Sequence, residues 1–172
     1  MINLNKIIIK SFFVIVLLFS FIIAGCNDKK LENESINYLN KKYPYSVTKE
    51  TDGHTRVDIS TENNFDENDL VYFKNLDNIT VLHYCSCEIT DKGIEYLKPL
   101  KNLERLSLSG SNLSEKVFQM ICLNYSNIEV LDLNNSTVTS QGFKYIGNLK
   151  KLKELTLIST NIDDEAIGYI SE

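Results

Sequence analysis

The chain has 172 residues, with 18 basic and 23 acidic side chains and a formal net charge of −5. An acidic chain lacks the basic surface that neutralises phosphates, which excludes nucleic acid as an expected partner. Three cysteines follow residue 26, and their spacing fits neither a disulfide framework nor a zinc pattern.

Residues 1–25 are predicted to be a signal peptide. Lys6 and Lys10 precede an apolar stretch over residues 11–23, and the sequence I-A-G-C follows at residues 23–26. This order is typical of a secretory signal, and its end resembles the lipobox of bacterial lipoproteins. The resemblance implies that Cys26 is acylated and anchors the protein outside the cytoplasm, on the cell membrane or the outer membrane. An uncleaved membrane anchor is the alternative, although the apolar stretch is shorter than the roughly 20 residues of a typical span.

Residues 26–34 are predicted to be the acylated cysteine and a short polar tether, which keeps the domain close to the bilayer. Removing residues 1–25 takes away Lys6 and Lys10, so 16 basic and 23 acidic residues remain and the net charge becomes −7. The remaining length suits one domain, which we place at residues 35–172.

Residues 35–56 are predicted to form an N-terminal cap made of a helix and an antiparallel strand. Leu39 and Tyr43 are spaced as on one helix face, and Pro44 ends the helix. The loop T-D-G at residues 51–53 favours a hairpin with glycine in the left-handed position. Such a cap covers a sheet edge that otherwise stays open. The hairpin places two residue pairs on one face: Val47 with Val57, and Tyr45 with Ile59.

Residues 57–78 are predicted to be a degenerate first repeat. Val57 and Ile59 alternate as they do on a strand, and Phe73 lies 24 residues before Leu97, its counterpart in the next repeat.

Residues 79–172 contain four copies of one pattern, each with three apolar residues spaced L-x-x-L-x-L, a polar turn and a short helix. The central apolar residues step by 24, 25 and 24 residues, a period and spacing typical of leucine-rich repeats. One strand and one helix cannot bury their apolar sides alone, so stacked copies are expected to share a continuous core. The triplets are Ile79/Leu82/Tyr84, Leu103/Leu106/Leu108, Ile128/Leu131/Leu133 and Leu152/Leu155/Leu157. The residues expected to cap the helices are Thr90, Ser114, Thr139 and Asp163.

The segments after the turns, such as I-T-D-K-G-I-E-Y-L at residues 89–97, resemble the cysteine-containing, ribonuclease-inhibitor-like class of leucine-rich repeats. The resemblance implies an α/β solenoid with parallel strands on its concave side, helices on its convex side, and a function in binding other macromolecules. It also implies a hydrogen-bonded ladder between neighbouring turns, at positions held here by Cys87, Ser111, Ser136 and Thr160.

No catalytic, metal or cofactor site is predicted. His83 and Cys85 share one strand face while Cys87 points elsewhere, and a closed zinc site needs four ligands. His83, Ser107 and Asp132 fall in one row on adjacent strands, with the serine in the middle. A working triad needs the histidine between the other two residues, so we expect a protein that is not an enzyme.

The residues between the apolar strand positions are predicted to form a concave binding surface. Their mixed charges and small side chains favour a specific, polar contact with another protein, whose identity the sequence leaves open. A solvated face without a partner is the plain alternative. The charged and polar members of this surface are Arg56, Asp58, His83, Arg105, Ser107, Asp132, Asn134, Glu154 and Thr156.

The sequence therefore predicts a membrane-anchored, extracytoplasmic protein-binding module. Two alternatives remain: a structural envelope lipoprotein that associates with itself, and an immunity or inhibitor lipoprotein, by analogy with the ribonuclease-inhibitor-like class. Self-association is expected at the C-terminal repeat, where the strand around Leu155 and Leu157 is an edge with unpaired N–H and C=O groups.

Overall fold

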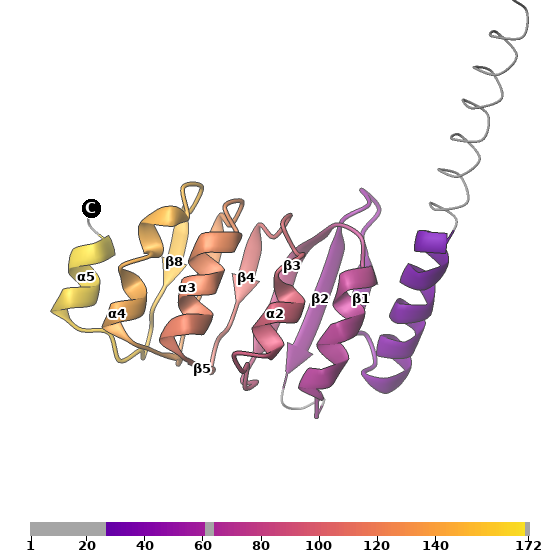
Figure 1. Ribbon diagram of the computed structural model, residues 1–172, viewed down its shortest axis with the longest axis horizontal. Helices are drawn as coiled ribbons and strands as arrows, with labels where there is room; N and C mark the ends of the chain where they lie inside the picture. The colour runs from indigo at the N-terminus through magenta and orange to yellow at the C-terminus, as the bar shows by residue number, and fades with distance from the viewer. Residues whose placement is uncertain (1–26, 61–63, 171–172) are drawn as a thin grey trace, which may run out of the picture.

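A computed structural model describes residues 27–60 and 64–170. The predicted signal peptide and Cys26 lie outside these residues. The described residues form an α/β fold in which helices line one face of a six-stranded, mostly parallel sheet (Figure 1). The predicted α/β class with a parallel sheet is thereby confirmed. None of the helices in this part of the chain has the length and apolar character needed to cross a bilayer.

The main sheet has the strand order β1-β2-β3-β4-β6-β8, and a two-stranded sheet pairs β5 with β7. Only β1 is antiparallel to its neighbour; all other neighbouring strands are parallel. The strands are β1 (Val47–Lys49), β2 (Thr55–Ser60), β3 (Ile79–Cys85), β4 (Arg105–Ser107), β5 (Asn112–Leu113), β6 (Val130–Asp132), β7 (Thr137–Val138) and β8 (Glu154–Thr156). The helices are an N-terminal helix over residues 27–42, then η2 (Glu67–Asn75), α2 (Gly93–Leu97), α3 (Glu115–Asn124), α4 (Ser140–Phe143), η3 (Ile146–Asn148) and α5 (Asp164–Ile170).

The strand register places each repeat directly beside the next. Leu82 pairs with Leu106, Leu106 with Leu131, and Leu131 with Leu155. Leu82 and Leu131 are fully buried, and Leu106 is 3 % exposed. The constant step in the sequence therefore becomes a row of stacked leucines, which is the core expected of neighbouring repeats.

Side-chain caps start most of the short helices. Ser114 Oγ accepts a hydrogen bond from Val117 N at 3.2 Å, and Thr90 Oγ1 accepts one from Gly93 N at 3.1 Å. Asp163 Oδ1 accepts one from Ala166 N in the same way, at 3.1 Å. These contacts satisfy N–H groups that have no partner within the helix. The expectation for Thr139 is wrong, because its side chain makes no capping hydrogen bond.

A partial ladder joins the turns that follow the strands. Ser136 Oγ donates to Leu108 O at 2.7 Å, and Ser111 Oγ donates to Tyr84 O at 3.4 Å, so two of the four expected positions link neighbouring repeats. Thr160 Oγ1 donates to Leu157 O within its own repeat, at 2.8 Å.

The N-terminal cap differs from its prediction in two places. β1 pairs with β2 in the expected register, with Val47 opposite Val57. The expected pair of Tyr45 with Ile59 is wrong, because Tyr45 has a left-handed backbone (φ 63°), precedes the strand and is 89 % exposed. The predicted tether is also wrong for residues 27–34, which are helical and continuous with residues 35–42.

A buried carboxylate holds the N-terminal helix against η2. Asp69, which is 6 % exposed, accepts hydrogen bonds from Tyr38 Oη at 3.1 Å, Lys42 Nζ at 2.6 Å and Tyr43 Oη at 2.6 Å. Two donors from the N-terminal helix and one from Tyr43, directly after it, therefore converge on one residue of the first repeat. A buried charge that is paired and hydrogen-bonded in this way avoids the desolvation penalty of an isolated one.

Candidate functional site

The candidate site lies on the face of the main sheet that points away from the helices, here called the open face. The strand register aligns Asp58, His83, Ser107, Asp132 and Thr156 in one row across five strands. The preceding positions form a second row, in which Arg56, Val81, Arg105, Val130 and Glu154 follow one another. All nine residues predicted for the binding surface thus belong to the strands of the open face or, for Asn134, to the turn after β6.

The N-terminal part of the open face carries a closed cluster of charges. Arg56 Nε donates to Asp58 Oδ2 at 2.7 Å, and Arg56 Nη2 donates to Asp58 Oδ1 at 3.0 Å. His83 Nδ1 lies 2.8 Å from the same Asp58 Oδ1. The carboxylate of Asp58 therefore already has a two-pronged guanidinium contact and a ring nitrogen as partners.

The C-terminal part of the open face is a hollow of about 390 Å³ between β4, β6 and β8. Asp132 lies in it, and its carboxylate accepts hydrogen bonds from Asn134 N (3.0 Å), Thr156 Oγ1 (2.8 Å) and Ser107 Oγ (2.9 Å). Burial acts to raise the pKa of Asp132, but these three hydrogen bonds, together with an electrostatic contribution from His83, hold it below its usual value. Asp132 is therefore ionised at neutral pH. The hollow is lined by His83, Arg105, Leu106, Ser107, Val130, Asp132, Asn134, Glu154 and Thr156.

Two exposed charges stand at the rim of this hollow. Within the described residues, the side chains of Arg105 and Glu154 make no hydrogen bond and no ion pair. Ser107, in contrast, is buried and only 8 % exposed, which corrects the expectation that its side chain is open to solvent. On one side of Ser107, Cys85 Sγ lies 3.4 Å from the Ser107 Oγ atom. On the other side, Ser107 Oγ donates a hydrogen bond to Asp132.

The cysteines in the described residues offer little reactive chemistry. Cys87 and Cys122 are buried, and burial raises the pKa of their thiols to about 11 and about 12. A thiol with such a pKa has almost no nucleophilic thiolate at neutral pH. Cys85 is half-buried on the open face and contacts Ser107. This contact was not predicted from the sequence, although the alternation of residues along the strands places both side chains on the same face.

The geometry around His83 separates it from the serine in its row. His83 contacts Asp58 and Arg56, whereas Ser107 donates to Asp132. An imidazole between serine and aspartate, which a triad requires, is not formed by these residues. The part of the chain that the structure describes also contains no group of three or more His, Cys, Asp or Glu residues arranged to hold a metal ion.

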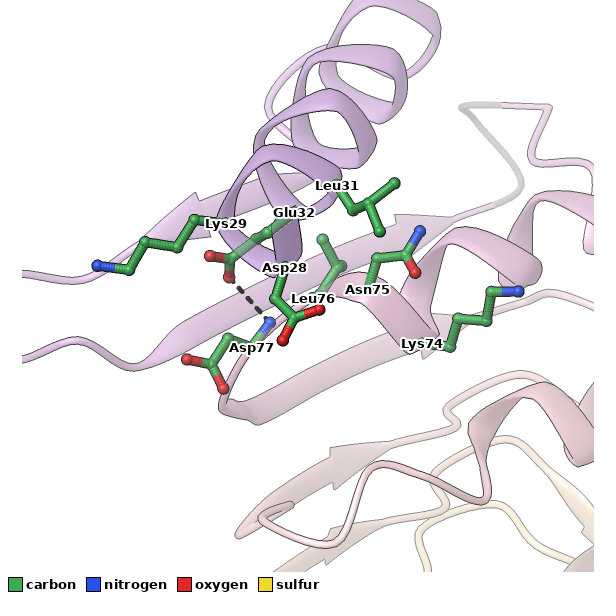
Figure 2. Close-up of a pocket in the computed structure, with 8 residues that line it drawn as sticks. All are labelled: Asp28, Lys29, Leu31, Glu32, Lys74, Asn75, Leu76 and Asp77. Carbon is green, nitrogen blue, oxygen red and sulfur yellow. Dashed lines mark hydrogen bonds between the residues drawn. The ribbon is translucent and has the colours of Figure 1, made fainter. Parts of the chain in front are cut away.

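A second hollow, of about 400 Å³, lies between the start of the N-terminal helix and the end of η2 (Figure 2). Glu32 Oε1 crosses it to accept a hydrogen bond from Asp77 N at 2.9 Å, and pairs with Lys49 Nζ at 2.6 Å. Lys29 and Lys74 extend away from the hollow on opposite sides (Figure 2). The carboxylate of Glu32 already has its partners within the chain. We therefore regard this hollow as a contact between the N-terminal helix and the first repeat, and the open face as the candidate site.

A third hollow, of about 300 Å³, lies at the C-terminal end of the stack, beside β8, η3 and α5. Leu155 and Leu157 are only half-buried there, although Leu131 and Leu133, one repeat earlier, are fully buried. Ile158 is 69 % exposed and Ile167 is 51 % exposed. Apolar surface is therefore concentrated on the last described repeat.

Of the comparisons with known proteins, only the one with solved structures gives a match. No protein-family model matches the chain, and no curated protein matches it. Among solved structures, an internalin from Listeria monocytogenes is similar over 67 % of this chain, with 19 % sequence identity and a TM-score of 0.37. The matched region spans 36 % of the internalin chain.

Proposed function

We propose that this protein is an extracytoplasmic leucine-rich-repeat module, anchored by a lipid on Cys26, that binds another protein on its open face. The repeat period and the strand register support the leucine-rich-repeat assignment. The I-A-G-C sequence at residues 23–26 supports the anchor. The observation that carries the binding function is the hollow around Asp132. A cationic rim residue (Arg105), an anionic rim residue (Glu154) and an ionised floor residue (Asp132) lie together there, and none of the three forms an ion pair within the described residues.

The contrast with paired charges elsewhere on the surface supports a binding role for this hollow. Several charges on the helical side pair across repeats, as Lys116 does with Asp91 at 3.0 Å and Lys144 with Glu115 at 3.3 Å. Arg105 and Glu154 lie on strands of the main sheet and have no such partner in the described residues. Solenoids use extended sheet faces of this kind for recognition, and complementary charges supply specificity in such contacts.

The test is capture of a partner from native membranes by tagged protein. Arg105→Glu reverses the charge at the rim of the hollow, and we expect it to abolish capture. Lys92→Glu is the matched control, because Lys92 is exposed at the start of α2 on the helical side and its side chain makes no hydrogen bond or ion pair in the described residues. If Lys92→Glu abolishes capture and Arg105→Glu does not, the binding surface is on the helical side and the proposal is wrong.

The anchor is tested separately. Cys26→Ala removes the thiol that is acylated, so we expect a larger, unprocessed precursor. Normal processing of this variant, with unchanged partition into detergent, would contradict the lipoprotein assignment.

Self-association is a second candidate function, favoured by the half-buried leucines and exposed isoleucines of the last described repeat. A second copy placed against β8 covers this apolar surface and pairs the edge of the sheet. Sedimentation over a range of concentrations distinguishes the two candidates. A monomer at every concentration contradicts self-association and leaves open-face binding intact.

A further inference from the structure

The same row of the open face holds two aspartates in different electrostatic environments. Asp58 has Arg56 and His83 as partners. Asp132, on β6 and separated from Asp58 by the two strands β3 and β4, receives only neutral hydrogen-bond donors: one backbone N–H and the hydroxyls of Ser107 and Thr156. Within the described residues Asp132 forms no ion pair, and His83, at the edge of the same hollow, acts on it through its electrostatic field without a hydrogen bond.

The carboxylate of Asp132 also has room for one more donor. A carboxylate offers about four acceptor positions. Oδ1 is used by Asn134 N and Thr156 Oγ1, whereas Oδ2 is used by Ser107 Oγ alone. The remaining position on Oδ2 belongs to a residue that lines the hollow of about 390 Å³.

The lining of the hollow has the composition that a long cationic side chain requires. Leu106 and Val130 supply apolar contacts, and Glu154 adds a second carboxylate that has no partner in the described residues. Lysine and arginine pack their methylene stems on apolar surface while the charged end reaches a polar group. A guanidinium also forms forked hydrogen bonds to carboxylates.

We infer that the hollow around Asp132 receives a positively charged side chain, arginine or lysine, of the protein that binds the open face; this inference rests on the function proposed above. Arg105, at the rim of the same hollow, then faces an acidic residue next to that cation. The partner chemistry is thus a protein surface that presents a basic side chain beside an acidic one.

The experiment uses the ¹⁵N-labelled full chain in detergent micelles and titrates it with N-acetyl-arginine amide. The amide of Asn134 is the reporter, because its N–H is bonded to Asp132 Oδ1 at 3.0 Å. We expect this amide to shift with N-acetyl-arginine amide and to stay unchanged with N-acetyl-citrulline amide, which has a similar shape and no charge. Equal shifts with both probes, or none with either, would overturn the inference.

Two substitutions locate the probe. Asp132→Asn is expected to weaken binding of N-acetyl-arginine amide about tenfold or more, since a charge-assisted contact is lost. Glu154→Gln, at an exposed position that cannot disturb the core, is expected to weaken it less. Asp164→Asn in α5 removes the same charge elsewhere and is expected to have no effect. If both open-face variants bind like the unchanged protein, the cation binds elsewhere and the inference is wrong.

Failure of this inference is distinguishable from failure of the proposed function. If the probe does not bind while Arg105→Glu still abolishes partner capture, the open face binds a protein without a cation in this hollow. If the probe binds at Asp132 while Arg105→Glu leaves capture intact, the hollow recognises cations but the partner binds elsewhere.

Discussion

The two ends of the stack differ in how their outermost strands are covered. At the N-terminal end, the antiparallel strand β1 and the helix over residues 27–42 cover β2 (Figure 1), and Val57 and Ile59 are almost completely buried. At the C-terminal end, Leu155 pairs with Leu131 in the same register but stays half-buried. Equivalent residues are therefore buried only where a neighbour lies on both sides, so the stability of each repeat depends on its neighbours.

The largest expected effect is in the middle of the stack. Leu131→Ala should lower the free energy of unfolding by roughly 2–5 kcal/mol, as truncation of a buried leucine does. Leu155→Ala removes the same atoms from a half-buried site and should cost clearly less. Chemical denaturation of both variants measures the difference. An equal loss of unfolding free energy in both variants would contradict the conclusion that the stability of a repeat depends on its neighbours.

The next largest effect concerns the attachment of the N-terminal cap. Asp69→Leu removes the acceptor shared by Tyr38, Lys42 and Tyr43. The hydroxyl of Tyr43 is the buried donor among the three. A buried donor left without a partner costs about 1–3 kcal/mol, so the midpoint of thermal unfolding should fall. Asp164→Leu, at an exposed site on α5, is the control. If Asp69→Leu and Asp164→Leu unfold at the same temperature, Asp69 does not attach the cap and the prediction is wrong.

A smaller, local difference is expected in amide exchange. The main chain of Leu131 lies between β4 and β8, whereas β8 is an edge strand. Amides at Leu155 should therefore exchange faster than those at Leu131, because local opening of a terminal repeat needs less free energy. Protection at Leu155 that grows with protein concentration would instead support pairing of this edge with a second copy.

The smallest effect on stability is expected on the open face. Arg105→Glu changes an exposed side chain without a partner in the described residues, and such substitutions usually change stability by no more than about 0.5 kcal/mol. Thermal unfolding should show a midpoint close to that of the unchanged protein. A large fall would mean that Arg105 supports the fold, and loss of capture by this variant would then no longer indicate a binding surface.

The register of the sheet could be predicted because the apolar pattern permits only one alignment. Shifting a strand by one residue would turn Leu106 or Leu131 out of the core. The same constraint predicted which residues share the open face. It did not predict how they pair, since Asp58 finds Arg56 and His83 through side-chain conformations that the strand period does not determine.

The failures of prediction lie where distant contacts decide the local structure. Residues 27–34 are polar and read as a tether, yet Glu32 binds Asp77, which is 45 residues further along the chain. The role of Asp69 was missed for the same reason, because its donors lie on the N-terminal helix and directly after it. The spacing of Tyr38 and Lys42, four residues apart on one helix face, was the available signal.

The claim that the open face binds another protein is tested most directly by site-specific photo-cross-linking in native membranes. A benzophenone amino acid replaces Glu154 at the rim of the hollow or, in a second variant, Leu123, which is 54 % exposed on α3. We expect a covalent adduct with a distinct protein from position 154 and none from position 123. An adduct formed only from position 123 would contradict the account and place the binding surface on the helices.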